Sequence, residues 1–137
     1  MVDNRLADDG LITQQSAYAV AETIERLAAA VMKRGMTVFA KIDHAEGAAK
    51  VNLPLRPTIL ILFGHAKGGT ALMQDRQTAG IDLPLKALAW EDADGKTWLS
   101  YNDPVWIARR HGLGAASVSA VEAMAAAMKA IVKEGAG

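Results

Sequence analysis

The sequence predicts a single α+β domain that spans residues 1–137, with a mixed sheet, a β-hairpin in its C-terminal half and flanking helices. The length of 137 residues suits one domain. The run ILILF at residues 59–63 is continuously apolar, which is typical of a strand buried on both faces. Asp94-Gly95 lies between two strand-like segments and favours a two-residue hairpin turn. Apolar residues recur at helical spacing in residues 20–34, which indicates an amphipathic helix.

The N-terminal elements follow from local patterns. Residues 11–18 form a weakly alternating first strand, and the helix at residues 20–34 ends before a glycine. Residues 36–42 alternate as a second strand. Asp43 then begins a short helix with Glu46 three residues further on, in the reciprocal pattern of a capping box.

The C-terminal half begins with an extended connection, because two prolines stand within residues 53–57. After the central strand, a helix is expected over residues 70–79. Asp-Pro at the start and glycine at the end predict a helix over residues 104–111. The last helix is expected within residues 119–135, where Ser119 and Glu122 form another capping box. Its apolar stripe, which runs from residue 118 to residue 132, is interrupted by charges, and this favours packing over membrane insertion.

The predicted hairpin fixes a register between its two strands. With Asp94 and Gly95 as the central turn residues, Trp90 faces Leu99, and Leu88 faces Tyr101. That pairing gives one consistently apolar face.

Composition excludes several classes of partner and site. Lysine plus arginine and aspartate plus glutamate both total 15, so the formal net charge is zero and does not favour nucleic acid or an anionic membrane. The absence of cysteine excludes disulfides and cysteine-based metal sites. The first ten residues lack the pattern of a signal peptide, and no apolar run approaches the length of a membrane span. The expected protein is cytoplasmic, with no membrane partner.

The segment TILILFGHAKGGTALM, residues 58–73, places a glycine-rich loop between a strand and a helix, as phosphate-binding loops do. Such a loop requires a lysine directly before serine or threonine. Here Gly69 occupies that position, and Lys67 precedes two glycines. The spacing therefore favours a tight connection in which the glycines serve backbone geometry.

The chain contains three segments with an Ile-Asp-His motif, a Phe-Gly loop and an Asp-Leu-Pro strand start: TVFAKIDHAEGAA, LRPTILILFGHAKGGTALM and GIDLPLKALAWEDADGKTWLSYNDP. Together, over residues 37–104, they resemble the bacterial family called domain of unknown function 302. The resemblance implies a compact α+β homodimer with no established activity, and a 51% hydrophobic composition with a mean hydropathy of +0.11 suits self-association. His44 falls on the family histidine, whereas His65-Ala66 replaces the Asn-Pro common in the family.

The sharpest functional hypothesis concerns His44 and His65, each of which follows a predicted strand. If the strands at residues 36–42 and 59–63 are parallel neighbours, both histidines lie at one sheet edge, where open α/β sheets bind ligands. The charged candidates near them are Asp43, Glu46, Lys67 and Asp82. This group would suit a small anion, a proton transfer or a metal held by two histidines. Packed, structural histidines are the alternative, and His111 suits a purely structural place at a helix C-terminus.

Three function classes follow. The first is a homodimeric module that binds a small ligand near His44 and His65. The second is an enzyme in which one of these histidines acts as a general acid or base, and the third is a structural or regulatory interaction protein. No residue pattern identifies a cofactor, a substrate or a reaction.

Overall fold

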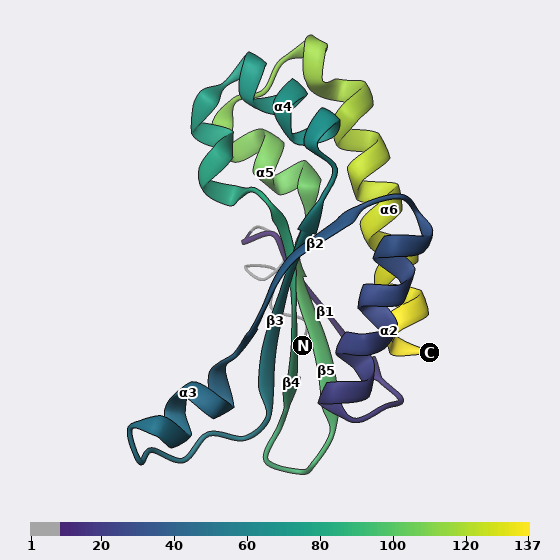
Figure 1. Cartoon of the computed structure of the whole chain (residues 1–137). Coiled ribbons are helices and arrows are strands. Elements are labelled where there is room, and N and C mark those ends of the chain that lie inside the picture. Colours follow the sequence, from purple (N-terminus) through teal and green to yellow (C-terminus); the bar gives the residue numbers. More distant parts are fainter. Residues whose placement is uncertain (1–8) are drawn as a thin grey trace, which may run out of the picture.

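The computed structural model describes residues 9–137, so the expectation for the first eight residues lies outside it. Five strands form one sheet in the order β1-β5-β4-β3-β2, and all neighbours are antiparallel (Figure 1). The strands are β1 (Leu11–Ser16), β2 (Thr37–Asp43), β3 (Thr58–Gly64), β4 (Leu85–Glu91) and β5 (Thr97–Asn102). The helices are α2 (Val20–Lys33), α3 (His44–Lys50), α4 (Ala66–Asp75), α5 (Pro104–His111) and α6 (Val118–Ala136), with 3-10 turns η1 (Gln77–Asp82) and η2 (Ala115–Ser117). The α+β class is confirmed, although the sheet is antiparallel throughout rather than mixed.

Helices α2 and α6 lie side by side over one face of the sheet (Figure 1). Leu27 and Val31 of α2 and Ile131 of α6 are completely buried with Ile61 and Phe63 of β3. Each such side chain contributes about 1.5–3 kcal/mol on burial. The apolar stripes expected on both helices therefore form the core.

The opposite face of the sheet carries apolar side chains that stay partly exposed. They are Leu60, Leu62, Leu88, Trp90 and Trp98. The Trp90 and Trp98 rings stack with centroids 6.3 Å apart. Figure 1 shows no helix among residues 9–137 lying across this face, which we call the open face.

The β4–β5 hairpin exists, but its predicted register is wrong by one residue. Trp90 pairs with Trp98, and Leu99 pairs with Ala89 instead of Trp90. The turn has three residues between Asp92 and Lys96, because the Asp92 amide donates to the Lys96 carbonyl oxygen at 2.8 Å. Only the last of the three, a glycine, has a positive φ. A three-residue loop of this kind moves the opposite strand by one position and exchanges its faces.

Strands β2 and β3 are joined by a projecting arm, residues 43–57, and not by a parallel crossover. Their antiparallel register pairs Thr37 with Gly64 and Asp43 with Ile59. The Asp43 carboxylate accepts the Glu46 amide at 2.9 Å and so caps α3, as expected. Helix α3 buries none of its side chains, and the arm extends from the body of the molecule (Figure 1).

A helical lobe, residues 65–83 and 103–120, stands at the other end of the sheet (Figure 1). Helix α4 begins at Ala66 and ends at Asp75, earlier than the expected 70–79. The earlier start has a local cause, because the His65 ring Nδ1 accepts the Lys67 amide at 3.3 Å and caps the helix. Helix α5 follows the prediction, with Asp103 as its cap and a left-handed glycine at its end.

Candidate functional site

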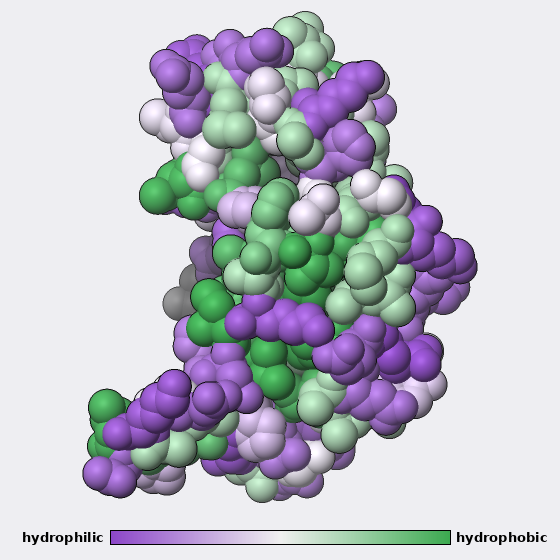
Figure 2. All heavy atoms as spheres, viewed as in Figure 1, coloured by the Kyte–Doolittle hydropathy of each residue, from purple (hydrophilic) through white to green (hydrophobic). Residues whose placement is uncertain are grey.

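A cavity of about 860 Å³ lies where α4, α6 and the adjoining ends of β2, β3 and β4 meet. Most of its walls are apolar. The larger apolar side chains in the lining are Met36, Phe39, Met73, Leu83, Pro84, Leu85 and Met124. Figure 2 shows hydrophobic surface gathered in the middle of this face, between the helical lobe and the strands. We call this space the α4–α6 cavity.

Small residues create the space. A Cβ on Gly68 would come within 3.2 Å of the Met124 Cε, and one on Gly69 would stand 3.7 Å from the Leu83 Cδ1. On the facing side, α6 presents Ala120, Ala123 and Ala127 to the cavity. Protein interiors are otherwise close-packed. The glycines thus bring α4 near its neighbours, while the alanines leave volume between them.

The polar side chains of the cavity are mostly cationic or neutral. They are Arg34, His65, Lys67, Thr70 and Ser119, and no aspartate or glutamate of the described chain lines it. Arg34 is already bound to Glu134 on α6. This hydrogen bond is the main cause that lowers the pKa of the Glu134 carboxyl. Within residues 9–137, Lys67 forms no ion pair, so it supplies the cavity's uncompensated positive charge.

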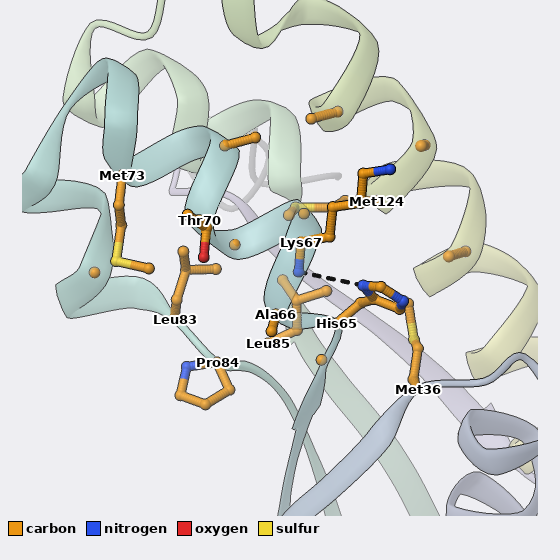
Figure 3. A pocket seen from close by; sticks show the side chains of 18 of the residues that line it. Met36, His65, Ala66, Lys67, Thr70, Met73, Leu83, Pro84, Leu85 and Met124 are labelled. Atoms are coloured by element: carbon orange, nitrogen blue, oxygen red, sulfur yellow. Dashed lines mark hydrogen bonds between the residues drawn. The ribbon is translucent and has the colours of Figure 1, made fainter.

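The predicted meeting of His44 and His65 is wrong. Because β2 and β3 are antiparallel, Asp43 pairs with Ile59 at the far end of β3 from His65. Six residues of strand at about 3.3 Å each separate the two histidines by roughly 20 Å. His44 and Asp43 lie exposed at the base of the arm, so a site shared by both histidines, with or without a metal, does not form. His65 and Lys67 do lie together, at the cavity (Figure 3).

Asp82 is also not part of the cavity lining. It is buried and accepts hydrogen bonds from the Arg110 Nη1 at 2.9 and 3.0 Å. The His111 Nε2 lies 2.5 Å from the same carboxylate, and the His111 Nδ1 lies 3.0 Å from the Thr78 hydroxyl. These contacts tie η1 to the end of α5. Asp82 was predicted as a ligand candidate, and the structure gives it this packing role instead.

The residues that shape the α4–α6 cavity were missed in the sequence. Met36, Met73 and Met124 read as ordinary core residues, because their helical or strand spacing is that of a packed face. One signal was present: the run AMAAAM, residues 123–128, places unusually small side chains beside methionines on one helix.

Proteins similar to this chain include two from Brucella. The "Fluoride-specific ion channel FluC 1" of Brucella suis biovar 1 is 51% identical over 132 residues, which are 96% of this chain and 52% of that protein. The protein of the same name from Brucella abortus biovar 1 is also 51% identical, and 49% of its length is covered. The chain therefore spans about half the length of these curated relatives.

These relatives contradict the expectation of a cytoplasmic protein, because an ion channel works in a membrane. The part of the chain that the structure describes also has one helix, Ala115–Ala136, that is long and apolar enough to cross a membrane by length and composition alone. The expectation that no such segment exists is thus wrong as well. In the folded chain, Met128, Ile131 and Val132 of this helix are buried in the core.

The fold agrees with a solved structure described as an uncharacterized conserved DUF302 protein from Bacillus stearothermophilus. The two superpose with a TM-score of 0.81 over 91% of this chain and 97% of that chain, at 17% identity. Residues 12–132 match the family described as "Domain of unknown function DUF302", a longer stretch than the resemblance over 37–104 indicated. By this match over most of its length, the chain belongs to the DUF302 family.

Proposed function

We propose that the chain binds a small, mostly apolar molecule in the α4–α6 cavity. One observation carries this proposal: a space of about 860 Å³ is lined chiefly by apolar side chains and a few polar groups. Ligand sites typically occupy about 300–1,000 Å³ and have this composition. The site keeps His65 and Lys67 of the predicted ligand-binding residues and excludes His44, Asp43 and Asp82.

An acid–base role for His65 has less support. A catalytic histidine is usually oriented by a carboxylate or a comparable partner. No carboxylate of the described chain lines the cavity, and the His65 Nδ1 faces the Lys67 backbone amide. The geometry therefore favours binding over catalysis.

The neutral dye Nile red tests the proposal, since its fluorescence rises in apolar surroundings. We expect saturable binding to the wild-type chain and at least about tenfold weaker binding to Ala123→Phe, whose ring would occupy the cavity. Ala126→Phe is the matched control, because Ala126 is exposed on the same helix and does not line the cavity. Thermal denaturation verifies that both variants fold. Equal binding by the two variants, or no saturable binding at all, would refute the cavity as the site.

We also propose that two copies of the chain associate through the arm. A seven-residue helix has little stability by itself, and α3 buries no side chain of its own chain. The arm exposes Val51, Leu53 and Leu55. The open face of the sheet offers apolar side chains to match, so a two-fold exchange would cover the arm of each copy with the open face of the other.

Light scattering measures this association. We expect a mass of twice 14.5 kDa at micromolar concentration for the wild type, and 14.5 kDa for Leu53→Glu. Met32→Glu is the control, because Met32 is an equally exposed hydrophobic residue outside the arm. A wild-type mass of 14.5 kDa would exclude the dimer. If Leu53→Glu is still a dimer, the interface does not involve the arm.

The Brucella relatives favour a second role, as an accessory domain of an ion channel. The chain matches only about half of each relative. Among residues 9–137, no further strand pairs with the outer edges of β1 and β2, and unpaired backbone groups at such edges would be costly in hydrocarbon. These features favour a matched half that lies outside the pore.

Deletion of the matched region from the Brucella suis relative tests this role. We expect fluoride conduction in vesicles to persist, because the pore would lie in the other half. Loss of conduction, with the shortened protein still present in the membrane, would place the matched half in the pore.

A further inference from the structure

We infer that the ligand of the α4–α6 cavity is an amphipathic monocarboxylate, an apolar tail that ends in one carboxylate. This inference rests on the proposed binding function and adds the chemical class of the ligand. It follows from the distribution of polarity and charge around the cavity, which differs between its two ends.

The two ends of the cavity differ in polarity. His65 and Lys67 stand at the start of α4 with Met36 and Met124, whereas Met73, Leu83 and Pro84 gather at the other end, where Thr70 adds a neutral hydroxyl and no charge (Figure 3). Both His65 and Lys67 are exposed, so the polar end opens to water. A ligand with one charged and one apolar end matches this arrangement, because its head stays hydrated while its tail is buried.

The charge at the polar end is positive. Arg34 is engaged by Glu134, and the lining residues of the described chain contribute no carboxylate to neutralise Lys67. The Lys67 ammonium is a compact point charge with three donors. A single charge of this kind suits a monoanion better than a phosphate dianion, which usually takes several donors.

His65 supplies a second donor. Its Nδ1 accepts the Lys67 amide at 3.3 Å. The neutral ring therefore carries its proton on Nε2, which has no hydrogen-bond partner within residues 9–137 and can donate to an oxygen acceptor. The first turn of α4 adds the positive end of its backbone dipole on the same side. A carboxylate that accepts from Lys67 and from the His65 Nε2 satisfies both donors.

Displacement of Nile red by octanoate and by 1-octanol tests the ligand class, since the two share the tail length and differ in the head. We expect octanoate to bind to the wild type about fivefold more tightly than octanol does. This difference in affinity should shrink as the salt concentration is raised, because salt screens the charge of Lys67. Lys67→Gln should abolish the preference, so that octanoate and octanol bind with similar affinity. Lys129→Gln, an exposed lysine on α6 outside the cavity, should keep it.

The outcomes separate the two proposals. Equal binding of octanoate and octanol, or a preference that survives Lys67→Gln, would overturn the carboxylate inference while apolar binding still stands. If Nile red, octanoate and octanol all fail to bind, the proposed function itself is wrong.

Discussion

Gly135 of α6 sits against the fully buried Leu27 of α2 and leaves no room for a side chain. A Cβ at this position would come within 2.5 Å of the Leu27 Cδ2. We expect Gly135→Ala to lower the free energy of unfolding by about 1–3 kcal/mol, because the added methyl overpacks the core. Urea denaturation measures the change.

Gly47 of α3 is the matched control, since a Cβ there would meet nothing within 4 Å. Gly47→Ala should raise the free energy of unfolding by about 0.5–1 kcal/mol through helix propensity alone. If both alanines change stability in the same direction, the close contact between α2 and α6 does not limit residue size.

Asp92 makes the stability of the hairpin depend on acidity. The Trp98 indole donates to its carboxylate at 2.8 Å, and the Lys96 and Asp94 amides donate at 2.9 Å each. These hydrogen bonds, the one from Trp98 first, lower the pKa of the Asp92 carboxyl below its usual value. The stabilisation is therefore complete above the unfolded pKa of about 3.9, and it is lost as pH falls through the lower folded pKa.

Urea denaturation at pH 5, 4 and 3 checks this prediction. The wild type should lose more stability than Asp92→Asn between about pH 4 and pH 3, because the variant has no carboxylate to protonate. Asp94→Asn, an exposed position on the same turn, should follow the wild type. A parallel decline of wild type and Asp92→Asn would contradict the assigned role.

Among the elements, η1 and α5 are held together by the Asp82 carboxylate. It is 9% exposed and accepts from Arg110 while contacting His111. We expect Asp82→Asn to destabilise the chain by about 1–3 kcal/mol, since two charge-assisted contacts at a buried carboxylate are weakened. Half of the Arg110 side chain is exposed, which limits the effect. Thermal unfolding of Asp82→Asn against Glu122→Gln, an exposed control on α6, measures it.

The sequence predicts which segments form helices and strands, but it does not predict whether neighbouring strands run parallel or antiparallel. Residues 59–63 form an interior strand of the sheet, as the continuous apolar run predicts, but the predicted burial on both faces is wrong, because Leu60 and Leu62 stay partly exposed on the open face. The segment 43–57 carries a capped helix and two prolines, and this pattern is equally compatible with a crossover or with a projecting arm. The predicted length of the hairpin turn is wrong for a similar reason, because Asp-Gly occurs in two-residue turns and also at the end of three-residue turns.

At the scale of the whole molecule, the candidate site depends on contacts between residues that are far apart in the sequence. The α4–α6 cavity arises because Gly68 on one helix faces Met124 on another, and because Ala123 leaves space nearby. His65 and Lys67 could be nominated from the sequence, since they stand next to each other at the end of a strand. The other residues that line the cavity around them could not be predicted, because their positions depend on how the helical lobe packs against the sheet.

The proposed dimer gives a prediction at this scale. If two copies cover each other's arms, dilution favours unfolding, so the melting temperature should rise with protein concentration between about 2 and 200 μM. Leu53→Glu should remove this dependence and melt at the same temperature throughout. A wild-type melting temperature independent of concentration would contradict a dimer that dissociates in this range.

The irregularity in β2 has a consequence for unwanted association. The register of β2 against β3 shifts between Val38 and Ala40, so Phe39 is an extra residue at an outer edge of the sheet. A bulged edge strand presents an interrupted row of amides and carbonyls and is a poor template for amyloid-like growth. Strand β1, at the other edge, pairs with β5 without any shift. Of the two outer strands that the structure describes, β1 is therefore the better template for fibril growth by strand addition, and the bulged β2 edge is protected.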